Sequence, residues 1–386
     1  MTDEREMRET FGDARGGEAR VYRAPGRVNL IGEHTDYNEG FVMPAAIDSY
    51  TWAAVAPRDD RRVTVRSDNF SEAVEFDLDE AEPRRRGHWS DYARGVAVTL
   101  ERAGVRLRGA DVLIKSDVPV GAGLSSSAAV EVAFGYAMLD ASGALVNRVE
   151  LARLCQRAEN EFVGVRCGLM DQFIASNARA GHALMLDCRS LDFDLLPLPA
   201  GVRLVVCNTS VRHALAGGEY NARRAECEEG VRLLARALPR VRALRDVTAD
   251  ELERFRNELP EVVYRRCRHV VTENARVVEA KAALEGGDLY AFGRLMGESH
   301  RSLRDDYEVS CAELDLMVKL ACDAEGVYGA RMTGGGFGGC TVNLVRAGAV
   351  DSFRQNVARG YEQATGRAPE IYVCSPAQGV SRVDGE

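Results

Sequence analysis

One helix without a polar face constrains the fold more than any other feature of the sequence. Residues 125–139, SSSAAVEVAFGYAML, are apolar almost all round, and such a helix is expected to be buried against a sheet. A strand-like segment at residues 110–119 leads into a glycine-rich turn directly before it. Other segments with the β-branched and aromatic character of strands are residues 21–32, 50–58, 62–68 and 73–79. The first half therefore combines strands with interposed helices.

The second half is mainly helical before it returns to strands. Helical patterns run from residue 220 to about residue 325, and loop and strand follow at residues 328–345. The segment LPLPAG interrupts the pattern near residue 200. We therefore predict an N-terminal domain of residues 1–200 and a C-terminal domain of residues 201–386. The order of the elements indicates an α+β protein rather than a regular βαβ repeat.

The composition argues against several classes of function. A net charge of −9 without any Lys/Arg tract disfavours a general affinity for nucleic acid. The first twenty residues are charged and lack an apolar core, so they predict neither a signal peptide nor a membrane anchor. Ten scattered cysteines with no CxxC pair indicate free thiols in a reducing cytoplasm rather than zinc ligands or disulfides. No obligate protein partner is evident.

The stretch PVGAGLSSSAA, residues 119–129, combines the features of a phosphate-binding loop. Gly121 and Gly123 let backbone N–H groups turn toward a ligand, three serines add hydroxyl donors, and a helix N-terminus follows. A glycine turn with a serine cap is the alternative. The chain has only three lysines and none follows a glycine, which excludes a P-loop, and the motifs of a protein kinase are missing.

A second glycine-rich stretch lies at residues 334–339, GGGFGG. It formally satisfies G-x-G-x-x-G, but a strand-like segment follows where a dinucleotide-binding fingerprint requires a helix. We reject that interpretation. Five glycines in six residues instead permit close backbone approach, either to a ligand or to another loop.

Acidic residues occur in three places where they are difficult to explain as surface charges. The stretch GRVNLIGEHTDYNEG, residues 26–40, places the carboxylates of Glu33 and Asp36, a guanidinium and an imidazole among glycines. Glu159 falls at the edge of the apolar face of its helix, where an unpaired charge is costly. Asp171 lies in the first turn of a predicted helix, where an acid either complements the helix dipole or serves as a general base for a hydroxyl.

Taken together, these stretches resemble the GHMP small-molecule kinases and, among them, the galactokinases. Residues 26–40 resemble the galactokinase signature in nearly every position, residues 119–129 the second, ATP-binding motif, and residues 330–341 the third. CGLMDQF around Asp171 and NTSVRHALAGGEYNARR leading to Tyr220 also match. The likeness spans residues 20 to 345, and Glu39, where many members carry glycine, is a minor departure.

The resemblance implies a two-domain α+β fold with the active site in the cleft between the domains. It implies Asp171 as catalytic base and Arg27 beside the transferring phosphate. The implied galactose-binding residues are Glu33, His34, Asp36, Gly168 and Tyr220. The implied Mg²⁺ ligands are Ser127 and Glu159. The implied ATP-binding residues are Gly121, Ala122, Gly123, Leu124, Ser125, Ser126 and Ser127.

The expected activity is ATP-dependent phosphorylation of the C1 hydroxyl of α-D-galactose, the first committed step of galactose catabolism. Carboxylates suit this substrate because each can accept hydrogen bonds from two neighbouring sugar hydroxyls. Two alternatives remain open. One is a kinase of the same family for a related sugar such as N-acetylgalactosamine, arabinose or a uronic acid. The other is a non-catalytic sensor of galactose and ATP.

Overall fold

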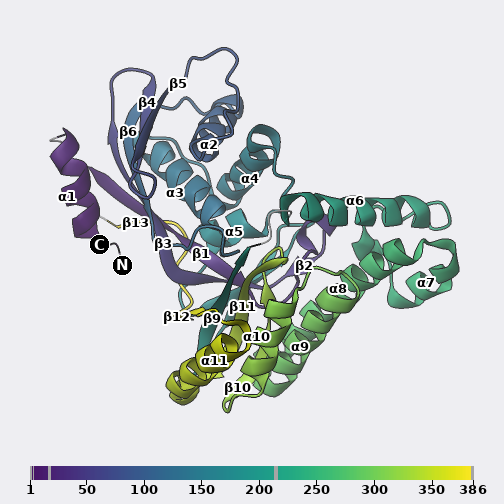
Figure 1. Cartoon of the computed structure of the whole chain (residues 1–386). Coiled ribbons are helices and arrows are strands. Elements are labelled where there is room, and N and C mark those ends of the chain that lie inside the picture. The colour runs from purple at the N-terminus through teal and green to yellow at the C-terminus, as the bar shows by residue number, and fades with distance from the viewer. Residues whose placement is uncertain (1, 3, 16–18, 213–215, 384–386) are drawn as a thin grey trace.

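In the computed structural model, strand β1 of the first sheet leads into residues 26–40, the opening motif, which begins in the last four residues of the strand and continues in the loop after it (Figure 1). The structure describes residues 2, 4–15, 19–212 and 216–383. Six strands run in the order β13-β1-β3-β6-β4-β5, and all neighbours are antiparallel except β4 and β6. They are β1 (Arg20–Asn29), β3 (Pro44–Pro57), β4 (Arg62–Ser67), β5 (Glu72–Asp77), β6 (Ala110–Ser116) and β13 (Ser381–Arg382).

Both faces of this sheet are covered, because side chains alternate between them along each strand. Ala53 and Val55 face the core beneath α2 (Asp91–Arg102), α3 (Ser126–Ala141) and α4 (Arg148–Ala158). Trp52 and Ala54 face the other way, where they pack with Met7 and Phe11 of α1 (Glu4–Arg15). Figure 1 shows α1 on the side of the sheet away from α3 and α4. The sequence patterns did not identify α1.

Helix α3 occupies the buried position that its composition predicts. It packs against β1 and β3 and is also covered by α2, α4 and α5 (Met170–Asn177). Most of its side chains are buried, including Phe134 and Met138, which are fully enclosed. The expectation of a helix buried against a sheet is confirmed.

A second, four-stranded sheet lies in the other half of the molecule. Its antiparallel order is β10-β11-β9-β12. One face packs against α10 (Ala312–Cys322) and α11 (Val350–Thr365), and the other against α8 (Glu261–Glu285) and α9 (Leu289–Asp305). The strands are β9 (Val202–Arg212), β10 (Val327–Thr333), β11 (Gly338–Arg346) and β12 (Glu370–Cys374).

A shared core joins the two sheets. Val28 and Ala45 of the first sheet belong to the same buried cluster as Val206 and Val342 of the second. A small sheet of β2 (Phe41–Val42), β7 (His182–Asp187) and β8 (Phe193–Pro197) lies beside it. The helices α6 (Ala216–Leu234) and α7 (Ala249–Arg254) complete the helical region. Residue 200 lies in the turn between β8 and β9, and the domain boundary there stays a prediction.

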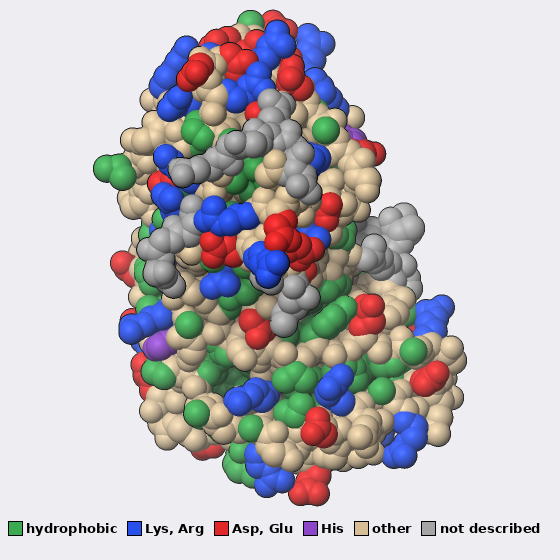
Figure 2. Space-filling model, turned by 90° about the vertical axis from the view of Figure 1, so that its left-hand side faces the viewer, with side chains coloured by type: hydrophobic (Ala, Val, Ile, Leu, Met, Phe, Trp, Pro, Cys, Tyr) green, Lys and Arg blue, Asp and Glu red, His purple; other side chains and the backbone are tan. Residues whose placement is uncertain are grey.

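The surface carries mixed charge on the face that Figure 2 shows. Lys/Arg and Asp/Glu side chains are interspersed there, and hydrophobic side chains gather between them in the lower half. No helix in the described ranges is long and apolar enough to cross a membrane. All ten cysteines are free thiols; six are buried, and Cys322 is exposed.

Candidate active site

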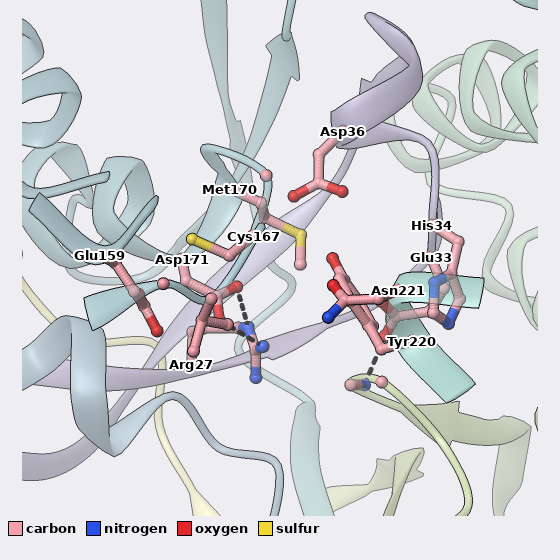
Figure 3. Close-up of a pocket in the computed structure, with 15 residues that line it drawn as sticks. Arg27, Glu33, His34, Asp36, Glu159, Cys167, Met170, Asp171, Tyr220 and Asn221 are labelled. Carbon is pink, nitrogen blue, oxygen red and sulfur yellow. Dashed lines mark hydrogen bonds and ion pairs between the residues drawn. The ribbon is translucent and has the colours of Figure 1, made fainter. Parts of the chain in front are cut away.

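A cavity of about 400 Å³ gathers eight of the residues singled out in the sequence (Figure 3). Those eight are Arg27, Glu33, His34, Asp36, Glu159, Gly168, Asp171 and Tyr220. Gly334 and Gly335 of the glycine-rich stretch, for which contact with a ligand was one alternative, also line it, and five further lining residues were not predicted: Gly164, Val165, Cys167, Met170 and Asn221. The cavity is therefore built from segments up to about 300 residues apart in the sequence, on both sides of residue 200.

Arg27 and Asp171 form a bidentate ion pair in the cavity wall. Arg27 Nε donates to Asp171 Oδ1 at 2.8 Å and Nη2 donates to Oδ2 at 2.8 Å. Burial opposes the charged guanidinium, but the negative charges of Asp171 and Glu33 raise the pKa of Arg27 above its ordinary value. Figure 3 shows the two side chains facing each other, with Glu159 on one side and Tyr220 on the other. This geometry orients a carboxylate beside a fixed positive charge.

Asp36 depends on the glycine at position 168. A Cβ on Gly168 would lie only 1.8 Å from Asp36 Oδ2, so no other residue fits while the carboxyl keeps this place. The Tyr37 backbone N–H donates to Asp36 Oδ1 at 3.0 Å. Burial, together with the charge of Asp171, raises the pKa of Asp36 to about 7. Gly168 thus makes room for an acid that forms no ion pair among the described residues, and its predicted role in galactose binding stays a prediction.

His34 lies in an aromatic cluster. Its ring centroid is 5.5 Å from that of Tyr220 and 4.7 Å from that of Tyr307. His34 Nδ1 shares a hydrogen bond of 2.7 Å with Tyr37 Oη, which in turn bonds Tyr307 Oη at 2.8 Å. Burial lowers the pKa of His34 to about 3, so the imidazole is neutral. Its Nε2 atom is buried without a hydrogen bond in the part of the chain that the structure describes.

Glu33 connects the opening motif to the glycine-rich stretch at residues 334–339. The Gly334 backbone N–H donates to Glu33 Oε1 at 2.6 Å, and Thr333 Oγ1 lies 3.3 Å from the same oxygen. The buried guanidinium of Arg331 lies 3.6 Å away. Glu33 therefore lines the cavity and also holds the third motif against the first.

The glycine-rich stretch approaches another loop, which is one of the two alternatives that the sequence leaves open. A Cβ on Gly334 would lie 2.9 Å from Gly123 O, and one on Gly339 would lie 3.1 Å from Ala122 O. Both glycines have positive φ, +85° and +83°. Glycine is needed here because two backbones nearly touch. Gly334 and Gly335 also face the cavity.

The loop of residues 121–127 turns through left-handed conformations before α3 begins. Gly121 and Gly123 have φ of 72° and 77°. The side chains of Ala122 and Leu124 are buried in the core, so these two residues can offer only backbone atoms to a ligand. Arg27 ties the loop to the cavity, because its Nη1 donates to Gly123 O at 2.5 Å and its backbone N–H to Leu124 O at 3.1 Å.

Glu159 belongs to a buried pair of acids. It begins the single π-helical turn Glu159–Val163 after α4, a feature often found at functional sites. Gln172 Nε2 donates to Glu159 Oε2 at 2.6 Å and to Glu131 Oε2 at 2.9 Å. Burial and the charge of Asp171 raise the pKa of Glu159 to about 7. Glu131 was missed in the sequence, although a charged residue inside an apolar helix is the signal that could have identified it.

Helices α8 and α9 hold the backbone of the opening motif from behind. Glu273 Oε1 accepts from the Gly32 backbone N–H at 2.9 Å and from Ser299 Oγ at 2.5 Å, and Oε2 accepts from Arg276 at 2.7 Å. His269 Nε2 bonds the backbone oxygen of Glu33 at 3.1 Å. The sequence assigns no role to this region beyond Tyr220. No local pattern could have found these contacts, because they join residues more than 230 apart.

Comparisons with known proteins agree with the geometry. Residues 7–57 match the galactokinase galactose-binding signature, residues 91–178 the GHMP kinase N-terminal domain and residues 280–363 the GHMP kinase C-terminal domain. The chain is 52% identical to the galactokinase of Roseiflexus sp. (strain RS-1), with 99% of this chain and 98% of that protein covered. The chain belongs to the galactokinase family.

Other members of the galactokinase family are similarly close. The galactokinase of Chloroflexus aggregans is 54% identical, with 94% of this chain and 93% of that protein covered. The crystal structure of Lactococcus lactis galactokinase complexed with galactose superposes with a TM-score of 0.94 at 38% identity, covering 98% and 99% of the two chains. A mevalonate kinase shares the fold, with a TM-score of 0.63 at 17% identity over 92% of this chain and 98% of that one. The predicted α+β GHMP kinase fold is confirmed.

Proposed function

We propose that the protein transfers the γ-phosphoryl group of ATP to the C1 hydroxyl of α-D-galactose and releases galactose 1-phosphate and ADP. The observation that carries this proposal is the Arg27–Asp171 pair in the wall of a cavity rich in carboxylates. Membership of the galactokinase family supports galactose and ATP as the two substrates. Both halves of the chain contribute, since Tyr220 and Gly335 line the cavity together with Arg27 and Asp171. This arrangement supports a cleft between domains of residues 1–200 and 201–386.

Galactose recognition is assigned to the side of the cavity formed by the opening motif. Asp36 and Glu33 would accept hydrogen bonds from sugar hydroxyls, and the buried Nε2 of neutral His34 offers a further polar contact. Tyr220 and the backbone at Gly168 complete the set. A misplaced hydroxyl in a different sugar would leave one of these buried groups unpaired, which is how such pockets discriminate between epimers.

The transfer step is assigned to Asp171 and Arg27. Asp171 would accept the proton of the C1 hydroxyl as its oxygen attacks the γ-phosphorus, and the bond from phosphorus to the bridging oxygen of ADP breaks. Arg27 keeps the carboxylate oriented through two hydrogen bonds of 2.8 Å. Its positive charge also stabilises the negative charge that spreads over the transferring group.

The loop of residues 121–127 is assigned to the ATP phosphates. Gly121 and Gly123 turn the backbone, and the N-terminus of α3 at Ser126 supplies free N–H groups and the positive end of a helix dipole. The carbonyl of Gly123 is held by Arg27. The phosphate site and the proposed base are therefore connected through one side chain.

The side-chain chemistry of the residues proposed for Mg²⁺ suits that ion. Glu159 is a buried carboxylate next to Asp171, and no described side chain forms an ion pair with it. Ser127 offers a hydroxyl, and hard oxygen ligands are those that Mg²⁺ prefers. No group of three or more His, Cys, Asp or Glu suited to a metal occurs in the described ranges, which agrees with an ion that takes most of its ligands from phosphates and water. When bound, the ion would neutralise phosphate charge.

The metal assignment has its own test. Converting Glu159 to Ala should raise the Mg²⁺ concentration that gives the half-maximal rate. Ser190→Ala, a change away from the proposed metal ligands, is the control. If the Mg²⁺ titration of the Glu159 variant coincides with that of the wild type, Glu159 is not a ligand.

A coupled assay of ADP release tests the proposed function directly. The purified protein should release ADP with galactose, and the sugar product should carry phosphate at C1 in its ³¹P and ¹H NMR spectra. If turnover is faster with N-acetylgalactosamine, arabinose or a uronic acid, that sugar rather than galactose is the substrate. Sugar and ATP binding without any ADP release would show that the protein is a sensor and contradict the proposal.

A further inference from the structure

Ser125 has a backbone conformation that is costly for a residue with a side chain. Its φ and ψ are 60° and 44°, in the left-handed region that favours glycine. It precedes the first residue of α3, where a serine usually caps the helix by accepting from a backbone N–H. The Ser125 side chain makes no such bond. The serine is therefore kept at this position for something other than helix capping.

The hydroxyl of Ser125 instead donates to Asp171 Oδ2. The same carboxylate already accepts two hydrogen bonds from Arg27. Three donors from two distant segments hold the carboxylate, which leaves little freedom for it to rotate. Free lone pairs remain for one incoming hydroxyl, because a carboxylate has about four acceptor sites.

These contacts form a closed circuit through three parts of the chain. Arg27 donates hydrogen bonds to Asp171 and to the carbonyl of Gly123, and Ser125, which lies in the same loop as Gly123, also donates to Asp171. The circuit links β1, the loop before α3 and the first turn of α5. A shift of that loop would consequently move Ser125 and disturb the carboxylate.

We propose that Ser125 is a positioning residue for the base Asp171, and that its hydroxyl serves the carboxylate rather than the ATP phosphates. This inference rests on the proposed function, because it assumes that Asp171 accepts the sugar proton. It also explains why a serine rather than a glycine occupies the left-handed position. The hydroxyl couples the conformation of the phosphate-binding loop to the orientation of the base.

The test compares S125G and S125A with a matched control. Ser71 is a second serine in the left-handed region, with φ of 52°, and it lies in the exposed turn between β4 and β5. S71G therefore reports the effect of relieving the backbone without touching Asp171. S125G should lower kcat about 10- to 100-fold, the range for losing a hydrogen bond to a charged group. The KM values for galactose and ATP should stay within about twofold, and Tm should not fall, because glycine accepts this conformation.

A double-mutant cycle separates positioning from a purely structural role. In the D171N background, where no base remains to be oriented, S125G should cause little further loss of kcat. A loss of the same size in both backgrounds would overturn the proposal. So would a raised KM for ATP with unchanged kcat, which would make the hydroxyl a phosphate ligand. If S125A is too unstable to purify, S125G alone still tests the positioning role, because glycine has no strained side chain at this position.

The wild-type assay keeps this inference distinct from the proposed function. If the wild type phosphorylates galactose and S125G is as fast, only the role of Ser125 fails. If the wild type releases no ADP with any sugar, the proposed function fails, and with it the premise that Asp171 is a base.

Discussion

Two buried polar clusters lie on opposite sides of the opening motif, and their acids behave differently. Behind the motif, Glu273 is buried, yet the positive charges of Arg276 and Arg331, together with the hydrogen bond from Ser299, outweigh burial and hold its pKa at about 2. In the cavity, burial raises the pKa values of Asp36 and Glu159 to about 7. The charge of Glu273 is therefore compensated by neighbouring groups of the protein, whereas the charges of Asp36 and Glu159 are not.

The difference separates residues that stabilise the fold from residues left for a ligand. The carboxylate oxygens of Glu273 accept hydrogen bonds from Gly32, Ser299 and Arg276, so its interactions stabilise the fold. Asp36 and Glu159 carry a desolvation cost, and neither forms an ion pair with a described cation, although the charge of Asp36 contributes to the raised pKa of Arg27. Strongly perturbed carboxylates in a cavity are typical of functional sites, and a sugar or a metal ion would supply the missing partners.

The largest expected effect is on the rate when the base is removed. D171N should lower kcat by ~10²- to 10⁴-fold, the usual contribution of a general base, while galactose still binds. Initial-rate kinetics and calorimetric titration with galactose measure the two quantities. D194N, which changes an exposed partner of Lys281, is the control and should be unaffected. Near wild-type turnover of D171N would remove Asp171 from the mechanism.

The second effect is on stability, in the compensated cluster. E273A should lower the free energy of unfolding by about 3–5 kcal/mol, because it leaves the partly buried Arg276 and the Gly32 N–H without their acceptor. Urea denaturation measures this change. E298A removes an acid from the partly exposed Arg294–Glu298 pair and should cost less than about 1 kcal/mol. Equal losses in the two variants would contradict the distinction between the clusters.

In the uncompensated cluster, one substitution should change binding and stability in opposite directions. The pKa of Asp36 is raised from 3.8 to about 7 in the folded protein, so its contribution to stability is present below about pH 4 and lost as the pH rises through 7. At pH 8, D36N should therefore be more stable than the wild type by about 1–3 kcal/mol. Its affinity for galactose should fall about 10- to 100-fold.

Thermal denaturation at pH 5 and pH 8 and galactose titration test this pair of effects. D192N, an exposed acid in the turn between β7 and β8, is the matched control and should show neither. If D36N is less stable than the wild type at pH 8, the carboxylate is compensated after all, and the contrast between the clusters fails.

The smallest effect concerns the neutral histidines. Burial lowers the pKa values of His34 and His269 from 6.5 to about 3 and about 4. The stability that these groups contribute is present above pH 6.5 and declines as the pH falls toward 4, by up to about 1.4 kcal/mol per pH unit for each histidine. The free energy of unfolding of H269Q should fall less steeply than that of the wild type between pH 6.5 and 5. Parallel curves would show that His269 binds its proton over the same pH range in the folded and unfolded protein, and would contradict the expected effect of burial.

Local patterns predicted much of the fold and most of the cavity wall. The nearly all-apolar composition of α3 and the β-branched and aromatic character of residues 50–58, which overlap β3, depend only on neighbouring residues, so both elements were predicted correctly. Helix α1 was missed because only Met7 and Phe11 mark its buried face. Gln172 and Glu273 were missed because their importance depends on contacts far along the chain.

The sequence by itself determined the family, the buried helix, the glycine turns and eight of the fifteen residues that line the cavity. These depend on local composition and on motifs that follow one another along the chain in the order found in the family. Only the tertiary structure decided which groups meet: Asp171 with Arg27 and Ser125, Glu33 with Gly334, and Glu273 with Gly32. It also decided which acids are compensated, because the charge state of a buried group depends on neighbours brought together by folding and not on its place in the chain.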